Sequence, residues 1–382
     1  MAKKVTVLGA GNAGHAAAFE ISLNGAEVML FEHPDFAKSL DGIKQKGGIE
    51  AVGELTAGDK VIPAMLSGFA KIAGLTTDPR EALGFADVIL MFVPQFAQEA
   101  IFKLVMPYLK DGQVFVILPG NFGSLIFKKM MQEAGIDKKV TFVETTSIPY
   151  AVRVIAPGTV YIEGKKTAFS AASLPASKIK GVLEALKGVL FLEVIPLKNV
   201  LEVWLSNPNM IMHVATATLG MGPMESRQGR IQFYAEGCSV SVAKVLEKED
   251  QERLAVGKAY GLKLMSFVEI INSFYSLNVK SIRDFAENTP VHNRMPNDSP
   301  KSPKERYISE DCPCGLVPVY EFGKAAGVTC PTMEAIIRID NIYNDVDYFK
   351  TGVTLEKLGL SGKGKEEILA LIDADGPGVY FI

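Results

Sequence analysis

The chain begins, after four residues, with Val5-Thr6-Val7-Leu8-Gly9-Ala10-Gly11-Asn12-Ala13-Gly14. The apolar start of this stretch predicts a β-strand, and its Gly-x-Gly-x-x-Gly turn predicts a helix that runs to about Leu23. Gly9 permits the tight turn, Gly11 lets the backbone approach a pyrophosphate, and Gly14 lets the helix pack against the strand. The N-terminus of that helix offers unpaired N–H groups and a partial positive charge to phosphates.

The next predicted strand, Glu27–Phe31, is followed by Glu32. A carboxylate at this point accepts hydrogen bonds from adenosine ribose hydroxyls and repels a 2′-phosphate, and no Arg or Lys stands beside it. The sequence therefore predicts a dinucleotide site that favours NAD(H), with NADP(H) as a possibility. The alternative is a glycine-rich turn of another kind of βαβ unit. The candidate cofactor-binding residues are Gly9, Gly11, Asn12, Ala13, Gly14, Glu32, Val93 and Pro94.

Length and composition indicate a soluble enzyme of two domains. A chain of 382 residues exceeds one ordinary core, and its hydrophobic fraction of 48% can supply two. The net charge of −3 gives no reason to expect nucleic acid or an anionic membrane, and no apolar run approaches the ~18 residues of a membrane span. The residues before the first strand do not resemble a signal peptide. Four cysteines in so long a chain do not indicate a disulfide framework, so we expect a cytoplasmic protein with reduced thiols.

The order of predicted elements places a doubly wound parallel α/β sheet in the first half and helices in the second. Strands and helices alternate in the first half, and Val88–Val93 is apolar on both faces, as in a central parallel strand. From about Lys198, apolar residues recur at helical spacing. We predict an NAD(P)-binding Rossmann domain over residues 1–198 and a helical substrate and catalytic domain over residues 199–382.

Two strand ends in the first half are candidate ligand loops, because open α/β sheets bind ligands beyond the carboxyl ends of their strands. One loop begins at Val93-Pro94, and the other is Leu118–Gly123. Within the second loop, Asn121 offers both a donor and an acceptor, which makes it a candidate substrate contact. Turn chemistry alone would explain the prolines and glycines of these loops equally well.

In the second half, His213 lies within an apolar helical run. A lone histidine on such a helix is more often a satisfied core residue than a catalyst. The other three histidines are less suitable, since His15 is in the dinucleotide helix, His33 follows Glu32, and His292 is in a Pro/Asn/Ser-rich loop. By elimination, His213 is the best-placed proton donor for chemistry beside a nicotinamide.

The second half also contains Arg306-Tyr307-Ile308-Ser309-Glu310-Asp311-Cys312-Pro313-Cys314. Two adjacent carboxylates near a planar guanidinium would suit a site for a small carboxylate substrate, although surface ion pairing is the plainer explanation. Cys312 and Cys314 have no second Cys or His pair at zinc spacing, so we expect buried thiols and no metal.

Taken together, these residues resemble the opine dehydrogenase family, whose members include octopine, nopaline and carboxyethyl-norvaline dehydrogenases. The resemblance covers nearly the whole chain, and the combination of the His213 helix with Arg306–Asp311 is its most specific part. It implies a Rossmann domain joined to an all-helical domain related to those of 6-phosphogluconate and glycerol-3-phosphate dehydrogenases. The stretches that carry it are Gly9–Ala16, Val93-Pro94, Leu118–Gly123, Asn207-Pro208, His213, Phe233–Gly237, Arg306–Asp311, Pro313 and Gly315–Pro318.

The resemblance implies that His213 and Asp311 form a catalytic dyad and that Arg306 holds a substrate carboxylate. Charged His213 would polarise a keto acid carbonyl and donate a proton as an amine condenses with it. Hydride from NADH or NADPH would then reduce the imine to a secondary amine. The implied substrates are a 2-oxo acid, commonly pyruvate, and the amino group of an amino acid that the sequence does not identify.

The chain departs from the family at Cys312, where an aliphatic residue is usual, and at Cys314. Both cysteines neighbour the proposed dyad, so they bear on the substrate pocket more than on the reaction type. Two alternatives to the opine reaction stay open. One is a reductase of the same architecture that converts a 2-oxo acid to a hydroxy acid. Such enzymes generally use a helical-domain lysine, for which Lys244 and Lys258 are the candidates. The other is an NAD-binding sensor without catalysis. A homodimer is possible in each case, since helical domains of this kind often pair.

Overall fold

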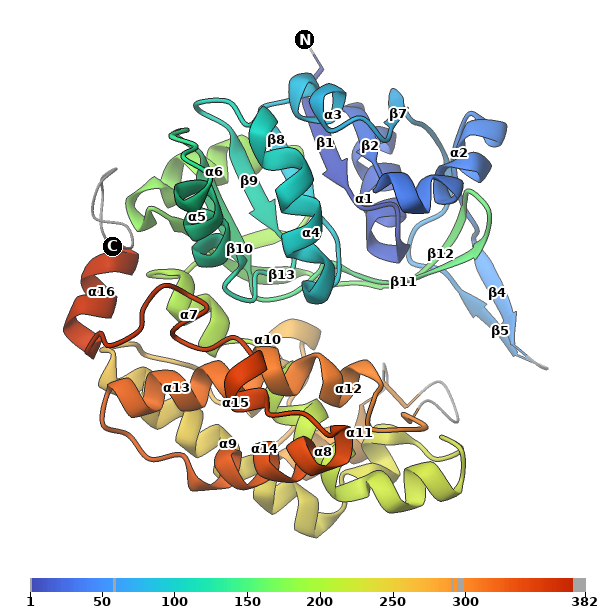
Figure 1. Ribbon diagram of the computed structural model, residues 1–382. Helices are drawn as coiled ribbons and strands as arrows, with labels where there is room; N and C mark the ends of the chain where they lie inside the picture. Colours follow the sequence, from blue (N-terminus) through green and yellow to red (C-terminus); the bar gives the residue numbers. More distant parts are fainter. Residues whose placement is uncertain (1, 58–59, 290–291, 294–298, 374–382) are drawn as a thin grey trace. The chain divides into compact units, whose positions relative to one another are not determined.

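The computed structural model describes residues 2–57, 60–289, 292–293 and 299–373, and the chain separates into two compact units (Figure 1). One unit contains the chain up to Val203 together with Ile372 and Asp373, and the other contains Trp204–Leu371. Among these described residues, helices long and apolar enough to cross a membrane are absent.

The first unit is built on an eight-stranded sheet with the order β14-β13-β10-β9-β8-β1-β2-β7. The order reverses between β1 and β8, which is the doubly wound arrangement that places ligands at the carboxyl ends of those strands. Neighbouring strands are parallel except for β13, which runs antiparallel to β10. The strands are β1 (Lys4–Leu8), β2 (Glu27–Phe31), β7 (Gly74–Thr76), β8 (Val88–Met91), β9 (Val114–Ile117), β10 (Thr141–Thr145), β13 (Ala168–Leu174) and β14 (Glu193–Pro196).

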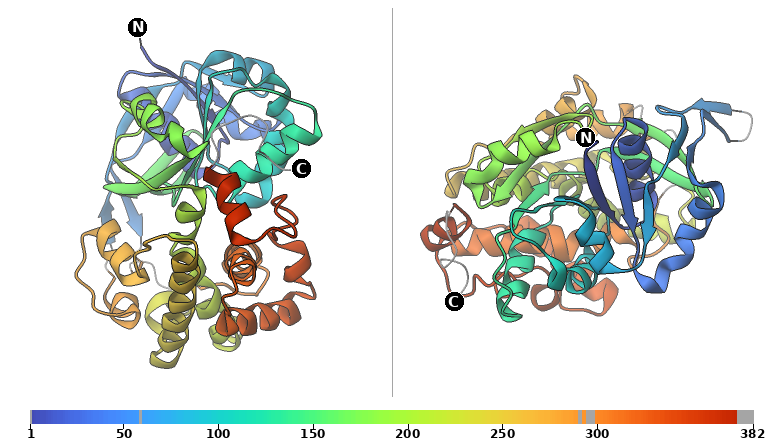
Figure 2. Two further views of the ribbon diagram at one scale, coloured as in Figure 1. Left: turned by 90° about the vertical axis from the view of Figure 1, so that its left-hand side faces the viewer. Right: turned by 90° about the horizontal axis from the view of Figure 1, so that it is seen from above.

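Helices cover both faces of this sheet (Figure 2). On one face, Phe102 of α4 and Phe127 of α5 stack at 3.9 Å and contact Phe115 of β9 and Phe142 of β10. The alternate strand residues join a core with α1 and α6 on the other face, so most strand positions on both faces are apolar. The helical segments are α1 (Asn12–Leu23), η1 (Pro34–Leu40), α2 (Asp41–Lys46), α3 (Pro79–Phe85), α4 (Gln95–Val105), η2 (Met106–Tyr108), α5 (Gly123–Glu133), η3 (Ala176–Lys178) and α6 (Ile179–Leu186).

A second sheet, with the order β11-β12-β3-β6, packs against α1. Because α1 contacts β1 and β2 on one side and this sheet on the other, its residues from Gly14 to Ile21 are all buried. The short strand β3, which follows Glu32 in the chain, pairs with β12 of the later hairpin β11–β12, a pairing that the sequence does not predict. The strands are β3 (Gly48–Ala51), β6 (Gly68–Lys71), β11 (Tyr150–Ala156) and β12 (Thr159–Lys165), and a separate ribbon contains β4 (Glu54–Ala57) and β5 (Lys60–Pro63).

The second unit is helical, as the sequence predicts. Its central helix, α8, packs against α9 and α14 and is buried on nearly all sides. The helical segments of the second half are α7 (Val200–Leu205), α8 (Asn209–Ser226), η4 (Phe233–Gly237), α9 (Val240–Ala259), α10 (Phe267–Tyr275), α11 (Ile282–Asn288), α12 (Arg306–Ser309), η5 (Cys312–Leu316), α13 (Val317–Ala325), α14 (Pro331–Asn344), α15 (Tyr348–Thr351) and α16 (Lys365–Asp373).

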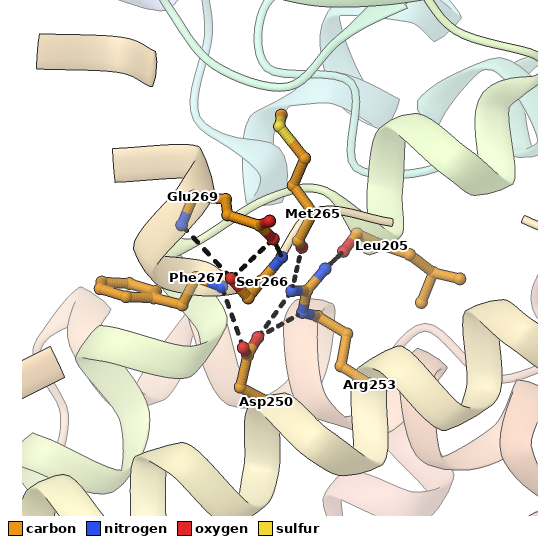
Figure 3. Close-up of polar contacts among 7 residues, drawn as sticks. All are labelled: Leu205, Asp250, Arg253, Met265, Ser266, Phe267 and Glu269. Carbon is orange, nitrogen blue, oxygen red and sulfur yellow. Dashed lines mark hydrogen bonds and ion pairs between the residues drawn. The ribbon is translucent and has the colours of Figure 1, made fainter. Parts of the chain in front are cut away.

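A buried ion pair holds three segments of this unit together (Figure 3). Arg253, only 1% exposed, donates from Nε and Nη2 to Asp250 Oδ1 at 2.9 and 2.6 Å. The same guanidinium donates to the carbonyls of Leu205, at the end of α7, and Met265. Asp250 Oδ2 accepts the N–H of Phe267, at the start of α10, at 2.9 Å. Every polar atom of the pair therefore has a partner, which is the condition under which a buried pair is tolerated.

We predict that Arg253→Ala destabilises the helical unit by about 3–5 kcal/mol, because it leaves the Asp250 carboxylate buried without its cation. Denaturant unfolding followed by the fluorescence of Trp204, the one tryptophan of the chain, measures this loss. The double variant Arg253→Met/Asp250→Leu should recover much of it, and Lys248→Ala, an exposed change on the same helix, should alter stability by less than about 0.5 kcal/mol. An Arg253→Ala protein as stable as the Lys248→Ala control would contradict this account.

Candidate active site

The structure brings His213 and Asp311 into direct contact. His213 lies in the first half of α8, and Asp311 immediately precedes η5. The imidazole Nδ1 is 2.8 Å from Asp311 Oδ2, although the two residues are 98 positions apart in the chain. The histidine is 8% exposed, so the contact is largely shielded from water. A carboxylate at Nδ1 fixes the proton on that nitrogen and directs Nε2 away from it.

Tyr234 occupies the other side of the imidazole. Its hydroxyl lies 3.2 Å from His213 Nε2. Tyr307 places its ring edge-on to the imidazole with centroids 4.8 Å apart, and Phe233 stacks on Tyr307 at 4.4 Å. His292 in turn stacks on Tyr234 at 4.6 Å. His213 is thus enclosed by aromatic rings that hold its orientation.

Two π-helical turns pack against the His213 helix. Tyr234 belongs to η4, and η5 begins at the residue after Asp311. A π turn inserts an extra residue into helical geometry and occurs frequently at functional sites. The sequence did not predict that Tyr234 and Tyr307 contact His213. Both tyrosines lie in stretches that carry the family resemblance, and this position was the one indication of a role at the site.

Arg306 lies at the start of α12, one short helix before Asp311. Its side chain is exposed, and its guanidinium forms no hydrogen bond or ion pair with any residue that the structure describes. Surface ion pairing, the plainer explanation of this stretch, is therefore not seen for Arg306 among those residues. Arg227, by comparison, is 3.8 Å from Glu236. Arg306 thus presents a planar cation that is available to a ligand.

The glycine turn has the geometry that a dinucleotide requires. Gly9 has φ +97°, and a Cβ on Gly14 would lie 1.8 Å from the Gly9 carbonyl oxygen, so both positions need glycine. A Cβ on Gly11 would meet nothing within 4 Å, which leaves its outer side open. Val93 adjoins the turn, since a Cβ on Gly9 would lie 2.6 Å from its side chain. Pro94 precedes the first residue of α4.

Glu32 lies beside this turn at the end of β2. Its Oε2 accepts the N–H of Ala10 at 2.8 Å, and its Oε1 accepts the N–H of His33 at 2.7 Å. The side chain of Asn12 instead accepts the N–H of Val154 of β11 at 2.8 Å, so it joins α1 to the second sheet. Ala13 is half-buried in the first turn of α1.

A buried carboxylate shapes the loop that contains Asn121. Glu144, fully buried on β10, accepts the N–H groups of Phe122 at 2.9 Å and Ser124 at 3.0 Å, and also the Ser124 hydroxyl. Burial raises the pKa of Glu144 to about 7. Asn121 itself has φ 50°, and its Oδ1 is buried without a hydrogen-bond partner among the described residues. The carbonyl of Asn121 accepts from Gln95 at 3.1 Å.

The two cysteines next to the dyad differ in exposure. Cys312 is fully buried, and burial raises the pKa of its thiol well above the ordinary value, whereas Cys314 is half-buried. No group of three His, Cys, Asp or Glu side chains among the described residues has an arrangement suited to a metal ion. Lys244 and Lys258 are both exposed on α9.

Comparison with known proteins identifies both units. Residues 4–134 match the N-terminal domain of NAD-dependent glycerol-3-phosphate dehydrogenase, and residues 196–344 match the alpha-helical domain of NAD/NADP octopine/nopaline dehydrogenase. An octopine dehydrogenase solved with NADH and agmatine has a TM-score of 0.77 at 20% identity and covers 98% of this chain and 99% of its own. An octopine dehydrogenase solved with NADH and pyruvate has a TM-score of 0.74 at 20% identity, with the same coverage.

The curated relatives give the family directly. An opine dehydrogenase of Arthrobacter sp. (strain 1C) is 35% identical over 361 residues, which span 94% of this chain and 96% of the relative. The chain therefore belongs to the opine dehydrogenase family, the NAD(P)-dependent oxidoreductases that act on CH–NH groups.

Proposed function

We propose that this enzyme condenses a 2-oxo acid with the amino group of an amino acid and reduces the resulting imine to a secondary amine, with His213 as the proton donor. The observation that carries the proposal is the 2.8 Å contact between His213 Nδ1 and Asp311. Asp311 orients the imidazole through Nδ1, and an imidazolium can donate from Nε2 to a carbonyl or carbinolamine oxygen. Loss of that oxygen as water leaves the imine carbon that accepts hydride.

In this proposal, Arg306 binds the carboxylate of the 2-oxo acid. Its guanidinium is free among the described residues and is carried by the same short segment as Asp311. A bidentate pair would fix the carboxylate and thereby orient the reacting carbon. Pyruvate is bound in one solved octopine dehydrogenase and agmatine in another, which supports a small 2-oxo acid and an amine as substrates here.

Asn121 is a second proposed substrate contact. Its loop is held by Glu144, and its buried Oδ1 lacks a hydrogen-bond partner among the described residues. An unsatisfied buried acceptor is costly, and an N–H or O–H group of a ligand would satisfy it.

The proposed cofactor contacts are the glycine turn Gly9–Gly14, Glu32, Val93 and Pro94, all in the domain that we assign to residues 1–198. The helix N-terminus behind Gly11 supplies N–H groups for the pyrophosphate. Glu32 already accepts two backbone N–H groups, which orient its carboxylate, and each oxygen retains a lone pair for a ribose hydroxyl. Its negative charge favours NADH over NADPH. Bound cofactor supplies the hydride.

The competing reaction, reduction of the 2-oxo acid to a hydroxy acid, would need a helical-domain lysine near the substrate. Lys244 and Lys258 are exposed on α9 and have no recorded contact with His213 or Asp311. A sensor without catalysis would not need the aligned dyad. We also propose a cytoplasmic location, where NADH is available. A homodimer stays a prediction.

The decisive experiment measures oxidation of NADH and of NADPH across a matrix of 2-oxo acids and amino acids. We expect turnover that requires both an acid and an amine, faster with NADH. The product should be an N-(carboxyalkyl) amino acid by mass spectrometry. Turnover that is indifferent to amine would establish the hydroxy acid reaction instead, and tight NADH binding without turnover would establish a sensor.

We predict that His213→Ala and Asp311→Asn each lower kcat by about 100-fold or more, the contribution expected of a positioned acid–base group. The Kd for NADH, measured by fluorescence quenching, should stay close to that of the wild type. The thermal midpoint should be recorded beside the kinetics, because a purely structural histidine would give an unstable protein with normal activity per folded molecule. That pattern would remove the dyad from the mechanism.

We predict that Arg306→Lys lowers kcat/KM about 10- to 150-fold, because an ammonium cannot reproduce the planar fork that binds a carboxylate. The penalty should shrink when the 2-oxo acid is replaced by its amide. Arg227→Lys, which changes a surface cation paired with Glu236, is the matched control and should leave kcat/KM nearly unchanged. Equal penalties on acid and amide would assign Arg306 a structural role.

A further inference from the structure

Asp340 is a fully buried carboxyl on α14 that touches the helix carrying His213. Its Oδ1 is 2.7 Å from the hydroxyl oxygen of Thr218, which lies on α8. The same hydroxyl oxygen is 2.8 Å from the carbonyl oxygen of Val214, the residue that follows His213. A single threonine hydroxyl thus lies between a carboxyl group and the backbone beside the catalytic histidine.

The number of protons decides how these contacts can be satisfied. A threonine hydroxyl has one hydrogen, whereas a carbonyl and an ionised carboxylate can only accept. If Asp340 is ionised, Thr218 can serve either Val214 or Asp340 but not both. If Asp340 carries a proton, it donates to Thr218, and Thr218 donates to Val214. The neutral acid therefore completes an unbroken chain of hydrogen bonds onto α8.

The surroundings of Asp340 favour the neutral acid. Its second oxygen, Oδ2, is buried without a hydrogen-bond partner among the described residues, and an ionised carboxylate in that position would be costly. Burial raises the pKa of Asp340 to about 7, against the opposing effects of hydrogen bonds with Thr218 and Cys312. The titratable groups that interact with it are Glu249 on α9, Cys312 on η5, Tyr343 on α14 and Tyr348 on α15.

Asp340 also adjoins the segment that carries Asp311. The thiol of Cys312, the residue directly after Asp311, interacts with the Asp340 carboxyl. One buried acid therefore contacts both segments that meet in the dyad, α8 through Thr218 and η5 through Cys312.

We propose that Asp340, in its neutral form, is a positioning residue that fixes the His213 helix and the Asp311 turn relative to each other. The inference rests on the proposed role of the dyad. Ionisation of Asp340 withdraws the Thr218 hydrogen from Val214 and places an uncompensated charge behind the dyad. The alignment of His213 with Asp311 is then lost, and kcat falls as the pH rises through the neutral range.

The pH profile of kcat tests this proposal with Asp340→Asn, whose amide donates to Thr218 at every pH. We expect the ratio of kcat for this variant to kcat for the wild type to rise at least about fivefold between pH 6 and pH 8. Thr218→Val should lower kcat about tenfold with an unchanged Kd for NADH, the order of magnitude of one lost hydrogen bond, and Thr218→Ser should restore it. A ratio that stays flat with pH, or normal kcat in Thr218→Val, would overturn the proposal.

Glu249→Gln is the matched control, since Glu249 is equally buried but forms no hydrogen bond to α8 among the described contacts. Burial raises the pKa of both carboxyls, so each of them lowers folding stability as the pH rises. Both variants lack one such carboxyl, and their stability should therefore fall less with rising pH than that of the wild type. Because Glu249 interacts with Asp340, Glu249→Gln can shift the pH profile of kcat along the pH axis, but only Asp340→Asn should abolish its fall with rising pH. The same change in Glu249→Gln would show a general effect of removing a buried acid and would overturn the proposal.

A measurement that needs no turnover separates this inference from the proposed function. The chain has four histidines, so ¹³C-labelled histidine gives a simple NMR spectrum in which His213→Ala identifies the His213 signal. In the wild type that signal should follow the ionisation of Asp340, with an inflection near pH 7 that Asp340→Asn abolishes. An inflection that survives in Asp340→Asn would overturn the coupling. If no substrate pair is turned over but the inflection behaves as expected, the proposed function fails and the coupling stands.

Discussion

The hydrogen bond between His213 and Asp311 constrains how the helical unit is built. It joins a helix and a turn that are 98 residues apart, in an environment where His213 is almost completely buried. A 2.8 Å contact tolerates little displacement, so both elements must be fixed by their own packing. The π turns η4 and η5 and the aromatic rings of Phe233, Tyr234 and Tyr307 provide that packing around the imidazole.

The Rossmann unit meets a comparable requirement with buried carboxylates. Glu32 accepts two backbone N–H groups beside the glycine turn, and Glu144 accepts two below the Asn121 loop. Loops at the end of a parallel sheet have N–H groups that no strand can satisfy, and a carboxylate can accept several of them. Each acid thus fixes a loop that we propose to contact a ligand.

Several parts of this architecture could be predicted from the sequence, because their information is local. The glycine turn lies within ten contiguous residues, and the alternation of strands and helices follows from apolar periodicity. The pairing of β12 with β3 joins residues more than a hundred positions apart, and no local pattern encodes it. The contact of His213 with Asp311 was implied only by the family resemblance, since nothing in either stretch alone specifies its partner.

The contact partners of Tyr234 and Asp340 could not be predicted from the sequence either. Tyr234 contacts the imidazole from the π turn η4, and no local residue pattern predicts that turn.

Asp340 lies four and three residues after Ile336 and Ile337 on α14, so helical spacing places it on the same face as these buried residues. Only the fold shows that its partner in the core is Thr218.

The buried acids of the chain then fall into two groups. Asp250 is paired with the cation of Arg253, whereas no comparable cation is among the groups that shift the pKa values of the buried carboxyls Asp340 and Glu249. A charge that is neutralised by a fixed cation stabilises one geometry over a broad pH range. A carboxyl that depends on a proton holds its geometry only while the proton is bound, and Asp340 lies next to the two segments whose alignment the dyad requires.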